Sequence, residues 1–125
     1  MAHTPRGELA VHVAHLPSVR VRASGLAASW RDESAGLLGD ALAAEEQSRA
    51  VLVGDLNGTA DDRALDPLTS RLNVAERGVA LSFPAAFPVA RIDQVMARGA
   101  AVASVRTLSA TGSDHLPVAA RVTWD

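Results

Sequence analysis

The sequence predicts a single α/β domain, and three observations carry that prediction. Two short apolar runs, residues 9–15 and 50–55, have the length and composition of buried strands. The stretch between them carries apolar residues at helical spacing. A strand, a helix and a second strand in this order form a crossover unit whose two strands are parallel. With 125 residues the chain is long enough for one such domain and one ordinary core.

The composition excludes several classes of protein. The formal charge is −2 and no window holds a dense run of basic residues, so the electrostatic footprint of non-specific nucleic-acid binding is absent. There is no cysteine, which rules out a disulfide or a thiolate metal site. All 12 basic residues are arginine, and a GC-rich genome explains that more simply than phosphate binding does.

The sequence shows no targeting or membrane segment. No apolar run approaches the length of a membrane span, and the first six residues lack the apolar stretch of a signal peptide. The chain as given is therefore expected to be soluble. Its localisation stays open, including an extracytoplasmic or membrane-anchored longer parent protein.

The first strand leads to a candidate site residue. Residues 1–8 are expected to be disordered or an added extension, and the domain is expected to span residues 9–125. The apolar face of the strand closes with His15, directly before Pro17 must end it. His15 therefore lies at a rim, where an imidazole meets both the core and a ligand. His12, on the other face, is interpreted as structural.

The helix between the two strands is interpreted as scaffold. Ser29 and Asp32 match a capping box, so the helix is expected to begin at Ser29 and to run to about Glu46. Arg20 and Arg22, in the connection before it, are interpreted as exposed loop residues. The positions expected to pack on the sheet are Trp30, Leu37, Leu38, Ala41 and Leu42. The positions expected to face water are Arg31, Glu33, Asp40 and Glu45.

The second strand ends in the stretch that organises the candidate site, Gly54-Asp55-Leu56-Asn57. Asp55 and Asn57 stand two positions apart, so on an extended chain they point to the same side. Gly54 is expected to remove a side chain that would crowd a ligand there. Glycine, aspartate and asparagine are also common turn residues, so this stretch taken alone favours a plain loop.

The remainder of the chain contributes a short helix and more strands. Asp61-Asp62 and Asp66-Pro67 are helix-start signals, followed by a helix to about Leu72. Three further strands are expected: residues 91–97, 100–108 and 116–123.

Three further polar positions fall on these strands or directly before them. Asp93 lies between apolar residues, where a carboxylate costs several kcal/mol unless it is paired. His115 precedes the last strand, and an acid that accepts its ring proton would orient it for acid–base chemistry. Asp93 and His115 are therefore expected to pair. Asp114 offers hard oxygen ligands that suit a divalent cation.

Four short motifs, in this order, resemble the later half of the endonuclease/exonuclease/phosphatase superfamily, the DNase I-like proteins. They are His15-Leu16-Pro17, Gly54 to Asn57, Arg91-Ile92-Asp93 and Ser113-Asp114-His115. The stretch Ser82-Phe83-Pro84 also resembles an element that often precedes the third motif. Each motif is weak alone, but the order and spacing together are specific.

The resemblance implies half of a four-layered α/β sandwich, with a mixed sheet and helices on one face. It also implies hydrolysis of a phosphate ester by activated water with Mg²⁺, or alternatively Mn²⁺ or Ca²⁺. In this pattern His15 would contact the scissile phosphate or assist the leaving group, Asp55 would align or activate the water, and Asn57 would bind phosphate. Asp93 orients His115, which stabilises the phosphate. Asp114 and Asp55 form part of the metal shell.

The first half of the family pattern, including its principal metal-binding glutamate, has no counterpart ahead of His15. We therefore expect a C-terminal half domain, incomplete as an isolated catalyst, whose exposed sheet face invites the missing half or self-association. A small-molecule or lipid phosphate is favoured over duplex DNA, because the charge is weak and stacking aromatics are few. The alternatives are an inactive fragment or interaction module that keeps the fold, and a plain domain in which all four motifs are coincidental.

Overall fold

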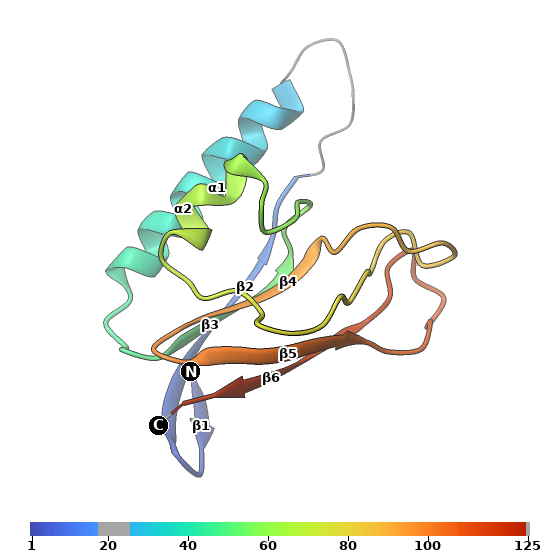
Figure 1. The fold of residues 1–125 in the computed structure, drawn as a ribbon. Helices are drawn as coiled ribbons and strands as arrows, with labels where there is room; N and C mark the ends of the chain where they lie inside the picture. The colour runs from blue at the N-terminus through green and yellow to red at the C-terminus, as the bar shows by residue number, and fades with distance from the viewer. Residues whose placement is uncertain (18–25, 125) are drawn as a thin grey trace.

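A computed structural model describes residues 1–17 and 26–124, and this part of the chain forms a mixture of strands and helices (Figure 1). None of its helices is both long enough and apolar enough to cross a bilayer. The elements in chain order are β1 (Ala2–Thr4), β2 (Gly7–His15), α1 (Leu26–Ala44), β3 (Ala50–Asp55), the 3-10 helix η1 (Arg63–Leu65), α2 (Asp66–Thr69), β4 (Asp93–Arg98), β5 (Ala101–Thr107) and β6 (Val118–Thr123).

The main sheet is mixed, with the strand order β1-β2-β3-β4. β2 and β3 are parallel neighbours joined through α1, as the strand-helix-strand pattern predicts. β1 pairs with β2 and β4 pairs with β3 in the antiparallel sense. β5 and β6 form a separate antiparallel pair.

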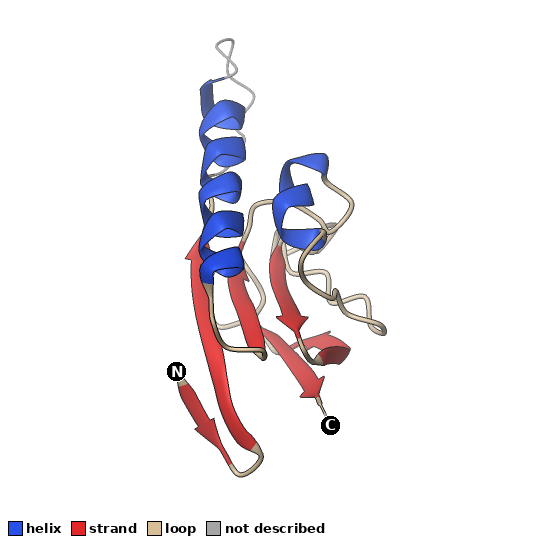
Figure 2. Cartoon of the chain, turned by 90° about the vertical axis from the view of Figure 1, so that its left-hand side faces the viewer, coloured by secondary structure: helices blue, strands red, loops and turns tan. Residues whose placement is uncertain are grey.

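The main sheet carries a hydrophobic core on each face. The helices lie together on one face, and the β5–β6 pair lies on the other (Figures 1 and 2). Because neighbouring strand residues point to opposite faces, Val51 joins the core under β5–β6 while Leu52 joins the core under the helices. The predicted mixed sheet with helices on one face is therefore confirmed. The core under the helices comprises Leu16, Ala35, Leu42, Leu52, Leu56, Leu65, Leu68, Leu72 and Met96.

The N-terminal segment differs from the prediction. Residues 1–8 were expected to be disordered or an added extension, but Ala2–Thr4 pairs with the start of β2 in a short hairpin. The hydroxyl of Thr4 donates to the Gly7 carbonyl at 2.8 Å and accepts from the Arg6 N–H at 3.1 Å. Gly7 adopts a positive φ of 116°, which suits a glycine at the turn. The expectation of disorder is wrong there, and the Pro5-Arg6-Gly7 turn is the signal that it overlooked.

Helix α1 begins earlier than predicted and presents a different face. It starts at Leu26, so Ser29 lies inside the helix and is not its N-cap. Leu42 is buried as expected, but Trp30 is largely exposed and Leu37 is 64% exposed. Ala41 is also exposed, and Arg31 lies on the packed side although it was expected to face water. Arg20 and Arg22 lie outside the described residues.

A glycine accounts for the rotation of α1. A Cβ placed on Gly39 would lie 3.0 Å from the Cβ and the carbonyl oxygen of Pro67, so the two helices meet closely at this point. The contact turns the side with Ala35 and Leu42 toward the core, and Leu37 toward solvent. The prediction of the packed face considered only apolar side chains. It did not include Gly39, and the predicted face was therefore wrong.

The later elements follow the predictions to within a few residues. Asp62 caps η1, because its carboxylate accepts from the Ala64 N–H at 2.9 Å. Asp66 is instead the first residue of α2, and the residue at its N-cap position makes no side-chain cap hydrogen bond. Strands β4, β5 and β6 lie where three strands were expected.

Candidate functional site

Three candidate residues form a row across one end of the main sheet. In the strand register His15 of β2 pairs with Asp55 of β3, and Asp55 pairs with Asp93 of β4. Adjacent strands lie about 4.8 Å apart, so paired residues are close neighbours. The register therefore brings together residues that are far apart in sequence.

Gly54 makes this register possible at the end of β3. It adopts a φ of 148°, and a Cβ at this position would lie 1.8 Å from the carbonyl oxygen of Ala14 on β2. The glycine is thus required by the neighbouring strand. Gly54 also lines the cleft beside the site, so the expected reason, room for a ligand, stays a prediction beside this closer contact.

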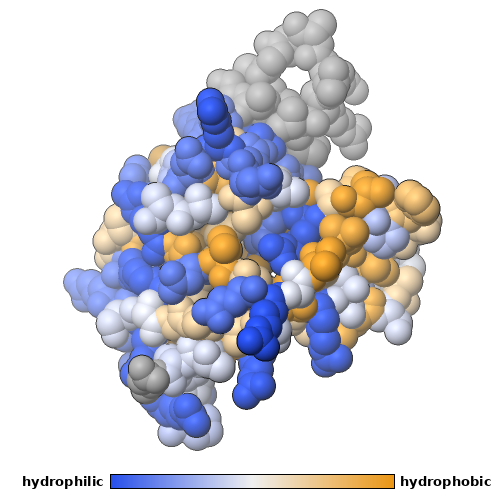
Figure 3. All heavy atoms as spheres, viewed as in Figure 1, coloured by the Kyte–Doolittle hydropathy of each residue, from blue (hydrophilic) through white to orange (hydrophobic). Residues whose placement is uncertain are grey.

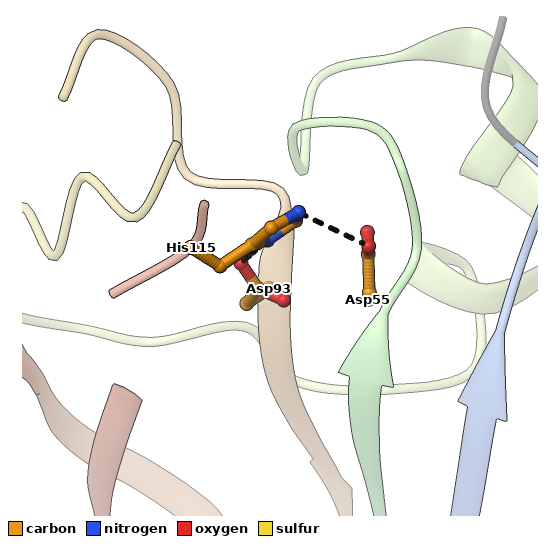
Figure 4. Close-up of side chains that lie close together, drawn as sticks. All are labelled: Asp55, Asp93 and His115. Atoms are coloured by element: carbon orange, nitrogen blue, oxygen red, sulfur yellow. Dashed lines mark hydrogen bonds and ion pairs between the residues drawn. The ribbon is translucent and has the colours of Figure 1, made fainter. Parts of the chain in front are cut away.

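His115 reaches the row from the loop between β5 and β6 and forms the expected pair with Asp93. Its Nδ1 lies 2.6 Å from Oδ2 of Asp93, and each side chain is about one-fifth exposed (Figure 4). The ring of Phe83 stands 4.9 Å from the imidazole, centroid to centroid, in a tilted arrangement. These contacts fix the ring plane, so Nε2 is the nitrogen that faces the row.

Backbone hydrogen bonds support the His115 loop from residues 82–90. The N–H of Ala85 donates to the Asp114 carbonyl at 2.7 Å, and the N–H of Leu116 donates to the Ser82 carbonyl at 2.7 Å. The residues on either side of His115 are therefore held. The stretch 82–84, which resembles a family element, contributes support and a ring contact to the site.

Asp55 lies between two imidazoles. Its Oδ2 is 3.6 Å from Nε2 of His15 and 3.6 Å from Nε2 of His115 (Figure 4 shows the second contact). Its other oxygen, Oδ1, accepts the N–H of Asn57 at 2.9 Å. A separation of 3.6 Å exceeds a direct hydrogen bond, so a water or a ligand oxygen can join these groups.

His15 and Asn57 take different places around this carboxylate. The side chain of His15 is 77% exposed at the rim of the sheet. Asn57 has a positive φ of 49°, and its amide Nδ2 donates to the Leu16 carbonyl at 2.5 Å. One of its two amide hydrogens thus ties the end of β2 to the turn after β3. The second Nδ2 hydrogen could donate to a phosphate, and phosphate binding by Asn57 stays a prediction.

Arg31 was expected to face water, without a role in the site, yet the structure places it behind the site. Its Nη1 donates to the Asn57 carbonyl at 2.8 Å, and its Nη2 lies 3.0 Å from Oδ2 of Asp62. The side chain is only 11% exposed. No local signal marks Arg31, because the partners that hold it, Asn57 and Asp62, come from a segment far along the chain.

The electrostatics of the site favour a protonated His115. Burial by itself lowers the pKa of His115, but the hydrogen bond to Asp93 and the negative charges of Asp93, Asp55 and Asp114 outweigh it. The pKa of His115 is therefore raised above its ordinary value. A raised pKa keeps the ring positively charged to higher pH, and that charge attracts an anionic ligand.

Three of these side chains could hold a metal ion. Ligand atoms of Asp55, Asp93 and His115 all lie within 4.8 Å of one another. Asp114, which was expected to bind the metal with Asp55, stands at the margin: its side chain is 80% exposed, and its Oδ1 lies 3.9 Å from Nε2 of His115. Carboxylate oxygens suit hard divalent cations, so the donor set fits such an ion, and the place of Asp114 in it stays a prediction.

A cleft opens beside the row. It has a volume of about 590 Å³. It lies between the loop before β6 and the face of the main sheet that packs on the β5–β6 pair. Asp93 and His115 line it together with Ser113, and Val53 and Val95 form an apolar part of its wall. The cleft is large enough for a small organic ligand with polar groups at one end.

Comparison with known proteins identifies the fold. No curated protein sequence matches the chain significantly. A protein from Bacteroides thetaiotaomicron assigned to the endonuclease/exonuclease/phosphatase family aligns with a TM-score of 0.69 and 21% identity, over 92% of this chain and 48% of its own. A mannosyl-6-phosphatase from the same organism aligns with a TM-score of 0.69 and 20% identity, over 91% and 51%.

A more distant neighbour extends the comparison. The sphingomyelinase C of Streptomyces griseocarneus aligns with a TM-score of 0.50 and 21% identity, over 86% of this chain and 51% of its own. The chain thus spans about half the length of the structures that it matches. The Endonuclease/Exonuclease/phosphatase family model matches residues 2–115, and the chain belongs to this family.

Proposed function

We propose that this chain carries the phosphate-binding and proton-transferring part of a phosphoesterase that hydrolyses a phosphate ester with water. One observation carries the proposal. Oδ2 of Asp55 lies between the Nε2 atoms of His15 and His115, at 3.6 Å from each, so it can accept a hydrogen bond from a water placed there. A base flanked by two imidazoles is suited to an anionic substrate attacked by water.

Asp55 acts as the general base in this proposal. Its Oδ1 is engaged by the Asn57 N–H, which leaves Oδ2 to accept a proton from water. The water oxygen bonds to phosphorus and the ester P–O bond breaks. The leaving alkoxide takes up a proton, so the products are an alcohol and a phosphate.

His115 stabilises the charge that develops on the phosphoryl oxygens. Asp93 accepts its Nδ1 proton, so Nε2–H is available to donate across the row. His15, exposed at the rim, is placed to contact the phosphate or the leaving oxygen from the other side of Asp55. The two imidazoles and the base thus surround the position expected for the phosphorus.

A divalent cation, with Mg²⁺ first and Mn²⁺ or Ca²⁺ as alternatives, would be held by Asp55 and Asp114. When bound, such an ion polarises the phosphoryl group and offsets part of its negative charge. The oxygen donors of these two side chains suit it. The remaining ligands would be water or groups outside this chain.

The substrate proposed is a small-molecule or lipid phosphate ester. Three apolar side chains are strongly exposed on the segment between α2 and β4, which also supports the His115 loop, and Phe87 reaches 77%. In Figure 3 hydrophobic atoms gather at the right of the view, over the loops that precede β4 and β6. An exposed apolar surface next to a phosphate site suits a substrate with an apolar group. The three residues are Val79, Phe87 and Val89.

A second candidate function is an inactive fragment or interaction module that keeps the fold. Val13 is 78% exposed on the same face of β2 as Leu9, which belongs to a core. This face suits a missing half domain or a second copy of the chain. Within the leading proposal the isolated chain is a weak catalyst, because the principal metal-binding glutamate of the family pattern has no counterpart ahead of His15.

Hydrolysis of bis(p-nitrophenyl) phosphate with and without Mg²⁺ tests the proposal. We expect slow, Mg²⁺-dependent turnover that Asp55→Asn and His115→Gln each lower by at least about 100-fold. His12→Gln is the matched control, because His12 pairs with Glu45 on the helix side of the sheet. Turnover that survives Asp55→Asn would contradict the proposal. Folded protein with no turnover under any of these conditions would favour the interaction module.

A further inference from the structure

Arg31 is a buried arginine that holds two partners at once. Its terminal nitrogens reach the Asn57 carbonyl at 2.8 Å and the Asp62 carboxylate at 3.0 Å, while its Nε is buried without a partner in the described part of the chain. Burying a guanidinium costs free energy unless its contacts are specific. The contacts of Nη1 and Nη2 with Asn57 and Asp62 therefore explain why this side chain is buried.

The loop that Arg31 holds is the one that sets the Asp55 carboxylate. Asn57 has a left-handed backbone conformation, with a φ of 49°, which is uncommon for a residue other than glycine. In that conformation its N–H points to Oδ1 of Asp55 and its C=O points to Arg31. One peptide segment thus connects the buried arginine to the open carboxylate.

The space around Gly58 shows how closely the loop lies against this ion pair. A Cβ on Gly58 would stand 3.0 Å from Oδ2 of Asp62 and 3.5 Å from Nη1 of Arg31. The Arg31–Asp62 pair is therefore packed against the chain directly after Asn57. Loss of the Arg31–Asp62 ion pair would therefore loosen the chain at Asn57 and Gly58, close to Asp55.

We propose that Arg31 is a positioning residue for the reaction: through Asn57 it holds Asp55 with Oδ2 directed at His15 and His115, without touching the substrate. This inference rests on the proposed function for its catalytic consequence. The structural part of the inference, that Arg31 keeps Asn57 in place, can be tested without any catalytic activity.

Arg31→Met tests the inference in the full chain, with Arg98→Met as the matched control. Arg98 is also partly buried, but it donates to backbone carbonyls of Leu42, Glu45 and Gln47 at the far end of α1. The control therefore reports loss of stability alone. Amide hydrogen exchange of Asn57 by NMR and steady-state hydrolysis of bis(p-nitrophenyl) phosphate are the two measurements.

We expect Arg31→Met to remove the protection of the Asn57 amide and to lower kcat about 10- to 100-fold, with KM changed less than about 3-fold. Arg31→Lys should recover part of both effects, because one ammonium group cannot span both partners. Arg98→Met should change neither at temperatures where it is fully folded. If Arg31→Met does not fold, Asp62→Asn should show the same changes in weaker form.

Two results would overturn the inference. One is an Asn57 amide that stays protected in Arg31→Met or, if that variant does not fold, in Asp62→Asn. The other is a loss of kcat as large in Arg98→Met as in Arg31→Met, which would show a general effect of stability. A wild-type chain without turnover would overturn the proposed function, while the amide measurement would still decide whether Arg31 holds the loop.

Discussion

Nδ1 of His115 lies 2.6 Å from Oδ2 of Asp93, and the other ring nitrogen lies 3.6 Å from Oδ2 of Asp55. The short contact joins β4 of the main sheet to the loop that leads into β6. The geometry of the site therefore depends on how the β5–β6 pair packs on the sheet, although neither strand itself supplies a site residue.

The first prediction concerns the titration of His115. Burial lowers its pKa, but the hydrogen bond and charge of Asp93, with the charges of Asp55 and Asp114, raise it above the ordinary 6.5. An NMR titration of the imidazole should show this raised pKa, and Asp93→Asn should bring the value down. A pKa that is the same in wild type and Asp93→Asn would contradict the assigned cause.

The same shift predicts the sign of the pH dependence of stability. A histidine whose folded-state pKa is raised contributes stability that is complete below its unfolded-state pKa. That contribution is lost as the pH rises through the folded-state pKa. The free energy of unfolding should therefore fall across this interval, and the fall should be smaller in Asp93→Asn when both are measured by urea unfolding.

The second prediction concerns a divalent cation. A cation held by Asp55 and its neighbours offsets the negative charge that keeps His115 protonated, so Mg²⁺ should lower the pKa of His115. The measurement is the NMR titration repeated at increasing Mg²⁺ concentration with ionic strength held constant. Asp55→Asn should abolish most of the response. An equal response in Asp55→Asn would place the cation elsewhere.

The sequence predicted which polar residues lie together better than it predicted the packing of α1. Short apolar runs are reliable signals for strands, and the crossover rule set β2 and β3 parallel, so His15 and Asp55 could be expected at the same edge. The unpaired acid Asp93 predicted a partner, and His115 is that partner. These inferences depend on the apolar pattern of the strands and on the free-energy cost of leaving the Asp93 carboxylate unpaired among apolar residues.

The face of α1 could not be obtained in the same way. Leu37 lies outside and Arg31 lies inside because α1 packs closely on Pro67 through Gly39, and because Asp62 and Asn57 supply partners for a buried guanidinium. Both causes come from segments far along the chain. Local apolar periodicity contains no information about either.

The third prediction concerns the exposed sheet face. Val13 is the most exposed of its large apolar side chains, and Val11 lies beside it on the same face. If this face associates with another copy of the chain, Val13→Glu should weaken self-association in sedimentation velocity. Val79→Glu, an equally apolar and exposed position on a loop, is the control. Unchanged association in Val13→Glu would assign the contact to another surface.

The fourth prediction concerns Arg98, which closes the C-terminal end of α1 from β4. Its guanidinium donates to the carbonyls of Leu42, Glu45 and Gln47 at 2.5, 3.0 and 2.8 Å. Helix ends leave carbonyls without partners, so Arg98→Met should cost about 2–3 kcal/mol of unfolding free energy. Arg121→Met, at an exposed position on β6, should cost less than about 0.5 kcal/mol.

The fifth prediction uses two glycines with opposite surroundings. A Cβ on Gly54 would lie 1.8 Å from the Ala14 carbonyl oxygen, so Gly54→Ala must separate β2 from β3 and should cost at least about 3 kcal/mol. A Cβ on Gly36, inside α1, meets nothing within 4 Å, so Gly36→Ala should stabilise the chain by about 0.5–1 kcal/mol. Urea unfolding of the two variants measures both effects. Because β2 and β3 carry His15 and Asp55 side by side, Gly54→Ala should also reduce hydrolysis, and a stable Gly54→Ala protein with full turnover would contradict the register on which the site depends.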